Sequence, residues 1–137
     1  MIVVDSSAVI AILFGEPGAT RLVERLSSEA ERVMSVASYL EAGTVLAGRR
    51  RTDRPQAQSD LDLFLAEAGI DLAPVDEGQA RLALRARIAY GKGMGHGGSL
   101  NFGDAFSYAL AKSLGAPLLY LGDDFTMTDV VSALSAT

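Results

Sequence analysis

The sequence contains no cysteine and only one histidine, His96. The missing cysteines exclude disulfide frameworks, thiolate metal sites and cysteine nucleophiles. A single histidine also excludes zinc sites that are built on a histidine pair. No hydrophobic run approaches the roughly 18 residues of a membrane-spanning helix, and the first five residues lack the basic start of a signal peptide. We therefore expect a soluble, cytoplasmic protein that does not bind membranes.

The composition predicts one compact domain with a substantial hydrophobic core. A chain of 137 residues fits a single domain spanning residues 1–137, and 49% of its residues are hydrophobic. The net charge of −5, from 12 basic and 17 acidic residues, disfavours a broad basic surface for nucleic acids. We interpret the arginines at positions 49–51, 54, 81, 85 and 87 as parts of solvated helix faces. A bound cation would neutralise part of the acidic excess.

Short β-branched runs alternate with longer helical patterns along the chain. The predicted strands cover residues 2–4, 33–36, 70–75 and 118–121, and the predicted helices cover residues 8–14, 17–28, 38–51, 56–68, 76–90 and 104–115, with a short last element from residue 130. This alternation predicts an α/β domain of three layers, with a parallel sheet of four to five strands and helices on both faces. Residues 91–103 carry six of the 14 glycines and predict a long, flexible loop.

Five acidic residues are predicted to lie at one edge of this sheet. Asp5 follows the first strand directly, and Asp123 and Asp124 follow the last strand. Glu41 lies in the first turn of the helix after the second strand. Asp104 lies in the first turn of the helix before the last strand. Carboxylates gathered at the carboxyl ends of parallel strands repel one another unless a cation lies between them. Oxygen ligands without histidine or cysteine favour Mg²⁺, with Mn²⁺ as a second possibility.

Each acid also has an interpretation that needs no function. Glu41 completes a capping box with Ser38, and Asp104 would do the same with Asn101. Asp123 and Asp124 suit a turn, whereas Asp5 ends a buried strand and must find polar partners. Ser6 and Ser7 either hydrogen-bond near Asp5 or cap the next helix. Tyr90, Phe102 and Tyr108 either stack on bases or belong to the core.

Several segments carry a family resemblance that spans nearly the whole chain. They are residues 2–8, 37–41, 90–93, 100–104, 121–125 and 128–130. Asn-Phe-Gly-Asp at 101–104 and Gly-Asp-Asp-Phe at 122–125, on either side of one helix, are the most specific of them. In this order and spacing, the chain resembles the PIN-domain ribonucleases of the VapC toxin type.

The resemblance implies a Mg²⁺-dependent endoribonuclease toxin that forms a homodimer and is neutralised by a cognate VapB-type antitoxin. The family's catalytic and metal-binding acids match Asp5, Glu41, Asp104 and a fourth acid in the 122–125 turn. Asp124 is the preferred match for the fourth acid, and Asp123 is a further ligand, either directly or through water. From the residues themselves, further candidates for contact with the RNA substrate are Ser6, Lys92, His96 and Arg85, and His96 is alternatively an exposed residue of the glycine-rich loop.

Two other functions compete with this interpretation. A catalytically idle PIN-fold protein that only binds a partner would lose its acids, whereas this chain retains all of them. A receiver-like phospho-acceptor domain needs an acid pair after the first strand and a lysine after a late strand. Only Asp5 follows the first strand, and neither Lys92 nor Lys112 follows a strand, so the receiver interpretation is disfavoured.

Overall fold

A parallel sheet forms the centre of the computed structural model, which describes residues 1–50 and 52–134. Its strands are β1 (Ile2–Val4), β2 (Arg32–Ser35), β3 (Ile70–Ala73) and β4 (Leu118–Leu119), in the spatial order β3-β2-β1-β4. Every pairing in this four-stranded sheet is parallel. The carboxyl ends of the strands therefore lie at one edge, as the sequence predicts.

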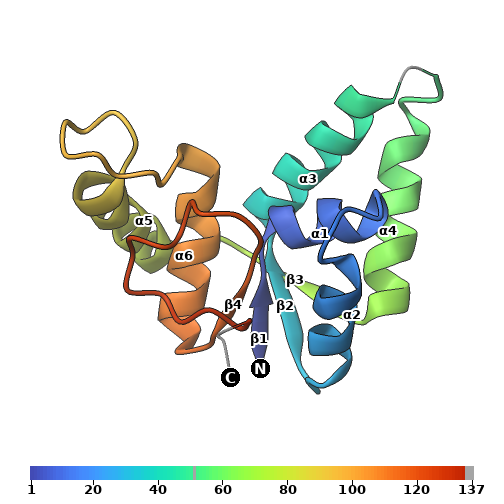
Figure 1. Cartoon of the computed structure of the whole chain (residues 1–137), viewed down its shortest axis with the longest axis horizontal. Helices are drawn as coiled ribbons and strands as arrows, with labels where there is room; N and C mark the ends of the chain where they lie inside the picture. Colours follow the sequence, from blue (N-terminus) through green and yellow to red (C-terminus); the bar gives the residue numbers. More distant parts are fainter. Residues whose placement is uncertain (51, 135–137) are drawn as a thin grey trace.

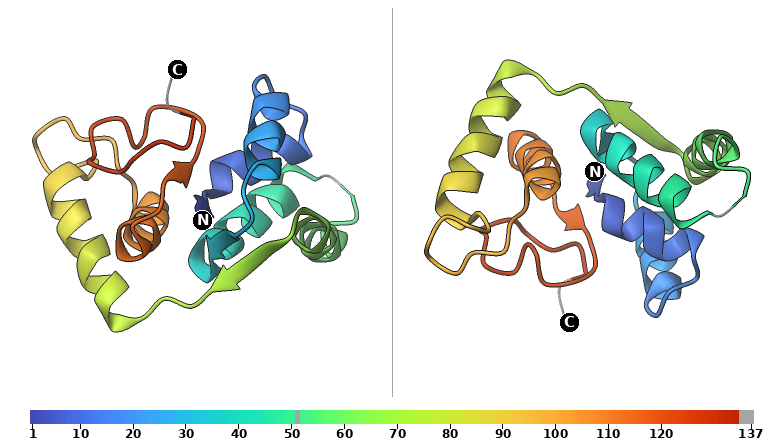
Figure 2. Two further views of the ribbon diagram at one scale, coloured as in Figure 1. Left: turned by 90° about the horizontal axis from the view of Figure 1, so that it is seen from below. Right: turned by 90° about the horizontal axis from the view of Figure 1, so that it is seen from above.

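Helices cover both faces of the sheet (Figure 1). They are α1 (Ser6–Leu13), α2 (Ala19–Ser27), α3 (Val36–Arg49), α4 (Gln56–Ala68), α5 (Glu77–Tyr90) and α6 (Phe102–Leu114). Views along the strands show α1 to α4 on one side of β1, and α5 and α6 on the other (Figure 2). The α/β fold class with a parallel sheet and helices on both faces is confirmed.

The central strand β1 divides the hydrophobic core in two. Ile2 and Val4 belong to the cluster under α1 to α4, whereas Val3 belongs to the cluster under α5 and α6. All three side chains are fully buried. The alternation follows from strand geometry, because successive side chains point to opposite faces. The residue after β1, Asp5, is therefore attached to a strand that is fully buried.

The start of α3 differs from the prediction. The helix begins at Val36, and the Ser35 hydroxyl caps it by accepting a hydrogen bond from the Ala37 amide at 3.2 Å. The predicted capping box of Ser38 and Glu41 is wrong, because Ser38 already lies inside the helix. Strand β2 fixes this start, since Ser35 is its last residue and pairs with Ala73. Glu41 consequently lies in the second turn and has no capping role.

Other element boundaries shift by a few residues. β3 ends at Ala73 and β4 at Leu119, short of the predicted 75 and 121, while α6 begins two residues early, at Phe102. The expected last element is reduced to an isolated bridge between Leu118 and Ser132. The loop after α5 is held at its base by a bridge between Gly91 and Leu100. No helix in the described part of the chain is long and apolar enough to cross a membrane.

Candidate functional site

Asp5 is held rigidly at the carboxyl end of β1. Its side chain is 1% exposed and caps α1, with Oδ2 accepting a hydrogen bond from the Ser7 amide at 3.0 Å. Oδ1 accepts a second hydrogen bond from the Ser107 hydroxyl at 2.6 Å. The buried carboxylate therefore has the polar partners that its position requires. Its two partners lie at the start of α1 and in the middle of α6.

Glu41 projects from the second turn of α3 towards the first turn of α6. Its Oε1 accepts a hydrogen bond from the Ser6 hydroxyl at 2.6 Å. Its Oε2 lies so close to Gly103 that a Cβ there would overlap the carboxylate. Any residue larger than glycine at position 103 would therefore displace the end of the Glu41 side chain. Burial is the main cause that raises the pKa of Glu41, and the charges of Asp5 and Asp124 add to it.

Asp104 occupies the first turn of α6 in the capping box that the sequence predicts. The Asp104 amide donates to Asn101 Oδ1 at 2.8 Å, and the Asn101 amide donates to Asp104 Oδ2 at 3.0 Å. Burial is the main cause that raises the pKa of Asp104, to about 8. The other carboxylates raise it further; they are Asp5, Asp124 and Glu41. Asp104 therefore caps the helix and is also part of a cluster of carboxyl groups.

The turn after β4 contributes one of its two acids to this cluster. The charge of Asp124 raises the pKa of both Glu41 and Asp104. Asp123 acts on neither of them, and its carbonyl accepts a hydrogen bond from the Thr126 hydroxyl at 2.8 Å. Both side chains are exposed. The structure thus brings Asp124, rather than Asp123, into electrostatic contact with the other acids.

The four acids have the chemistry of a site for a hard divalent cation. They supply only oxygen donors, the type that Mg²⁺ and Mn²⁺ take in proteins. Their mutual repulsion is relieved when positive charge lies between them. Among residues 1–50 and 52–134, however, no three acidic or histidine side chains are already arranged to hold a metal ion. Hydrogen bonds from Ser6, Ser7, Ser107 and the Asn101 amide hold the carboxylates of Asp5, Glu41 and Asp104 instead.

Of the polar residues predicted to contact substrate, two form hydrogen bonds within the protein and two are exposed without an ion pair among the described residues. Ser6 is engaged with Glu41. His96 is engaged by the loop itself, because Nε2 lies 3.1 Å from the Ile88 carbonyl and Nδ1 accepts from the Gly98 amide at 3.3 Å. Lys92 and Arg85 are exposed, and neither forms an ion pair within the described residues.

Of the aromatic residues predicted to stack on bases or to belong to the core, one is buried, one is half-buried and one is exposed. The buried Tyr108 donates a hydrogen bond from its hydroxyl to Asp129, and its ring centroid lies 6.1 Å from that of Tyr90. Phe102 is 71% exposed at the start of α6 and packs edge-on against Phe106. Phe102 is therefore the aromatic side chain next to Asp104 that is free to contact a ligand.

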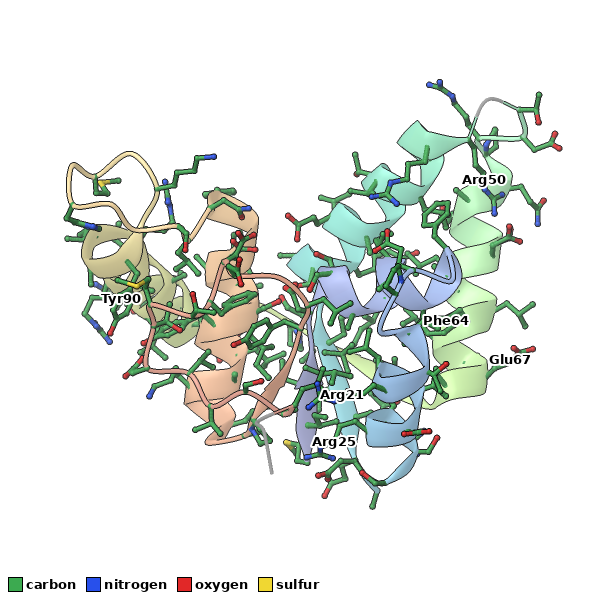
Figure 3. All side chains as sticks on the ribbon, in the orientation of Figure 1. Arg21, Arg25, Arg50, Phe64, Glu67 and Tyr90 are labelled. Atoms are coloured by element: carbon green, nitrogen blue, oxygen red, sulfur yellow. The ribbon has the colours of Figure 1, made fainter. Side chains whose placement is uncertain are left out.

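Several arginines form the solvated, paired faces that the sequence predicts. Arg49 pairs with Glu16 at 3.0 Å, Arg50 pairs with Asp60, and Arg81 pairs with Glu77 at 3.3 Å. Figure 3 shows Arg50 at the far tip of the α3–α4 pair, and Tyr90 on the other side of the molecule. Arg51 lies outside the described residues.

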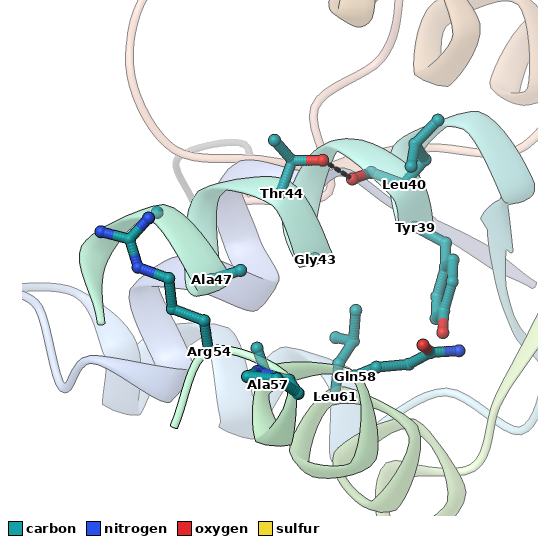
Figure 4. Close-up of a pocket in the computed structure, with 11 residues that line it drawn as sticks. Tyr39, Leu40, Gly43, Thr44, Ala47, Arg54, Ala57, Gln58 and Leu61 are labelled. Atoms are coloured by element: carbon teal, nitrogen blue, oxygen red, sulfur yellow. Dashed lines mark hydrogen bonds between the residues drawn. The ribbon is translucent and has the colours of Figure 1, made fainter. Parts of the chain in front are cut away.

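A groove of about 630 Å³ lies between α3 and α4 (Figure 4). Its lining is mostly apolar or small, and consists of Tyr39, Leu40, Gly43, Thr44, Ala47, Gly48, Arg54, Pro55, Ala57, Gln58 and Leu61. Leu40, at the rim, is 68% exposed. The groove depends on how two helices pack, so the sequence pattern does not predict it.

Comparison with known proteins identifies the family. Residues 2–131 match the model of the PIN domain. Ribonuclease VapC42 of Mycobacterium tuberculosis is 44% identical over 128 residues, which cover 93% of this chain and 95% of the relative. The chain belongs to the PIN-domain family of VapC ribonucleases. The resemblance predicted from the sequence is thereby confirmed.

Solved structures of a VapC toxin and of a toxin–antitoxin complex share the fold. The crystal structure of Mycobacterium tuberculosis VapC20, a Sarcin-Ricin loop cleaving toxin, has a TM-score of 0.74 at 16% identity and covers 96% of this chain and 97% of VapC20. A toxin–antitoxin complex from Klebsiella pneumoniae has a TM-score of 0.71 at 15% identity and covers 99% of this chain and 100% of its counterpart. At these identities the likeness concerns the VapC fold.

Sequence reasoning missed Gly103 and Ser107, and it gave Ser38 a capping role in place of its contact with Ser107. Ser107 follows Asp104 by three positions, and Ser38 precedes Glu41 by three positions. This spacing places each serine on the same helix face as its acid, and is the signal that identifies them. Gly103 carries no such signal, since its role depends on a side chain of another helix.

Proposed function

We propose that this VapC-family protein is a Mg²⁺-dependent endoribonuclease toxin. The observation that supports the proposal most directly is the electrostatic clustering of Asp5, Glu41, Asp104 and Asp124 at the carboxyl edge of the sheet. Such an edge is where ligands of parallel α/β folds bind. The proposal treats residues 1–137 as one PIN domain.

The four acids would hold the divalent ion, and the remaining residues would place the RNA. When bound, the ion acidifies a water molecule and offsets negative charge on the phosphate that is cleaved. Asp5 presents a fixed carboxylate, because Ser7 and Ser107 hold its two oxygens. The exposed Lys92 and Arg85 supply positive charge for the RNA backbone. The exposed Phe102 offers a ring on which a base can stack.

The proposal is tested by replacing acids with amides of the same shape. We expect Asp5→Asn and Asp104→Asn each to lower the rate of RNA cleavage by more than about 100-fold, beyond the loss typical of residues that only support a metal ligand. Growth inhibition on expression should disappear as well. Circular dichroism checks that both variants fold. Cleavage at the wild-type rate in either folded variant would refute the proposal.

The pair Asp123 and Asp124 provides a matched comparison within the same turn. We expect Asp124→Asn to reduce cleavage strongly and Asp123→Asn to have a smaller effect, because only Asp124 acts on the other acids. Asp123 would then be a peripheral ligand at most. Equal losses in the two variants would assign both carboxylates to the site.

We propose a cognate VapB-type antitoxin as the partner of this chain. A toxin–antitoxin complex is among the structural neighbours. The α3–α4 groove offers an apolar surface with an exposed rim at Leu40, which suits the apolar face of a peptide segment. We assign the groove to the antitoxin for this reason. A homodimer belongs to the same proposal, and the exposed Leu84 and Ile88, one turn apart on α5, support it.

A further inference from the structure

Two buried serine hydroxyls connect Asp5 to the helices that carry the other acids. The Ser107 hydroxyl lies 2.6 Å from Asp5 Oδ1, and the Ser38 and Ser107 hydroxyl oxygens lie 2.8 Å apart. Ser38 and Ser107 are both 0% exposed, and Asp5 is 1% exposed. The contacts join residues 69 and 102 positions apart in the sequence. These three groups form a relay within the protein interior.

The chemistry of the groups fixes the direction of this relay. An ionised carboxylate only accepts hydrogen bonds, whereas a serine hydroxyl donates one proton and accepts through its lone pairs. Ser107 therefore gives its proton to Asp5 and has none left for Ser38. Ser38 must donate to Ser107. The order is Ser38 to Ser107 to Asp5, and each bond in such a chain polarises the next.

The relay links the three elements that carry the most buried acids. Ser38 lies on the same face of α3 as Glu41, one turn earlier, and Ser107 lies on the same face of α6 as Asp104, one turn later. The serines therefore tie α3 and α6 to the end of β1 directly below the acid cluster.

We propose that Ser107, supported by Ser38, is a positioning residue that holds Asp5 for divalent-cation binding. The inference rests on the proposed metal-dependent function. Groups that orient metal ligands affect affinity although they do not touch the ion. A serine pair that only fills space would contribute to stability and leave affinity for the ion unchanged. Affinity therefore distinguishes the two roles.

The experiment measures Mn²⁺ binding to the purified full-length chain, without RNA, by titration calorimetry. We expect Ser107→Ala to weaken Mn²⁺ binding about 10-fold or more, in the range known for groups that orient metal ligands. Ser38→Ala should have a smaller effect, because Ser107 still donates to Asp5. The double variant should be no weaker than Ser107→Ala alone, since Ser38 acts only through Ser107.

The control is Ser113→Ala on the same helix. The Ser113 hydroxyl donates only to the Leu110 carbonyl and lies away from the acids, so wild-type Mn²⁺ affinity is expected. Urea unfolding of each variant records any loss of stability separately. Wild-type affinity in a folded Ser107→Ala variant would overturn the inference, as would additive effects of the two serines.

Two further outcomes separate this inference from the proposed function. If Ser107→Ala does not fold, Ser38→Ala provides the test, and wild-type Mn²⁺ affinity in that variant overturns the inference. If the wild-type chain cleaves RNA and binds Mn²⁺ and the serine variants do the same, only the inference fails. A wild-type chain that neither binds Mn²⁺ nor cleaves RNA refutes the proposed function, and the inference with it.

Discussion

Asp104 combines a structural and an electrostatic role in one carboxyl group. It caps α6 together with Asn101, and it lies buried near three other acids. Capping favours the ionised form, because the Asn101 amide donates to the carboxylate. Burial and the neighbouring charges favour the neutral form, and together they prevail. The proton affinity of the folded, metal-free protein is therefore higher at this residue than that of the unfolded chain.

This difference predicts how stability depends on pH without divalent ions. The pKa of Asp104 is raised from 3.8 to about 8, so folding binds a proton between these values. The stabilising contribution is complete below about pH 4 and is lost as the pH rises towards 8. We expect the free energy of unfolding, measured by urea denaturation in a chelator, to fall from pH 5 to pH 8. Asp104→Asn should flatten this dependence, because the amide does not titrate.

Asp123→Asn is the control for the pH experiment. Asp123 is exposed and does not act on the buried acids, so its removal should leave the pH dependence as in the wild type. Glu41, whose pKa is raised in the same direction, accounts for any slope that remains in Asp104→Asn. An unchanged slope in the Asp104→Asn variant would contradict the assignment of the proton to Asp104.

At the scale of elements, the close approach of Glu41 in α3 to α6 depends on a glycine, which has no side chain. Gly103 in the first turn of α6 lets Glu41 of α3 approach the helix backbone. The same carboxylate accepts the Ser6 hydroxyl from α1. Three helices thus meet at Glu41.

Gly103→Ala should therefore separate activity from stability. The new Cβ would overlap Glu41 Oε2, so Glu41 must move and lose its present place near Ser6. Alanine also favours a helix over glycine by roughly 0.5–1 kcal/mol, which offsets part of the strain. We expect RNA cleavage to fall about 10-fold or more, while the urea midpoint changes little.

Gly48→Ala is the matched control on α3. A Cβ there meets no atom within 4 Å, so the substitution should raise stability by roughly 0.5–1 kcal/mol and leave cleavage unchanged. A Gly103→Ala variant that cleaves RNA as fast as Gly48→Ala would show that Glu41 does not need this approach.

Some element boundaries and contacts could be predicted from the sequence, and others could not. The end of α4 was predictable, because Gly69 adopts a left-handed conformation with φ of 65° after the last apolar residue. The start of α3 was not, because Ser35 and Ser38 are both good caps and only strand pairing selects Ser35. The clustering of the acids was predictable, because they follow strands or lie near helix starts. The contact of Ser107 with Asp5 and the role of Gly103 were not predictable, since their partners lie in other elements.

At the scale of the whole molecule, the acid cluster and the α3–α4 groove have α3 in common. Glu41 belongs to the cluster, while Leu40 and Thr44 line the groove. An antitoxin segment in the groove would therefore lie next to the helix that carries Glu41. The net charge of −5 also means that positive charge on such a segment is attracted.

Filling the groove should disrupt antitoxin binding without loss of nuclease activity. Gln58 is exposed on α4 and lines the groove, so Gln58→Trp places a large ring inside it. We expect the affinity for the VapB-type antitoxin that neutralises the wild type to fall about 10-fold or more, as for disruption of an interface centre. Calorimetry measures binding, and cleavage of RNA without antitoxin should stay unchanged.

Ser59→Trp provides the matched control for this prediction. Ser59 is the next residue of α4, is equally exposed, and does not line the groove. It should bind the antitoxin as the wild type does. Wild-type affinity in Gln58→Trp, or an equal loss in both variants, would place the antitoxin elsewhere on the surface.

The position of Asp5 at the end of the central strand has a consequence for how the two sides of the cluster respond to a ligand. Asp5 follows a strand whose side chains are buried in both hydrophobic clusters, so a shift of its backbone requires opening of the core. Asp124 lies on an exposed turn and is free to adjust by local motion alone. Asp5 thus has a fixed position in the site, whereas Asp124 can adjust its position to a bound ligand.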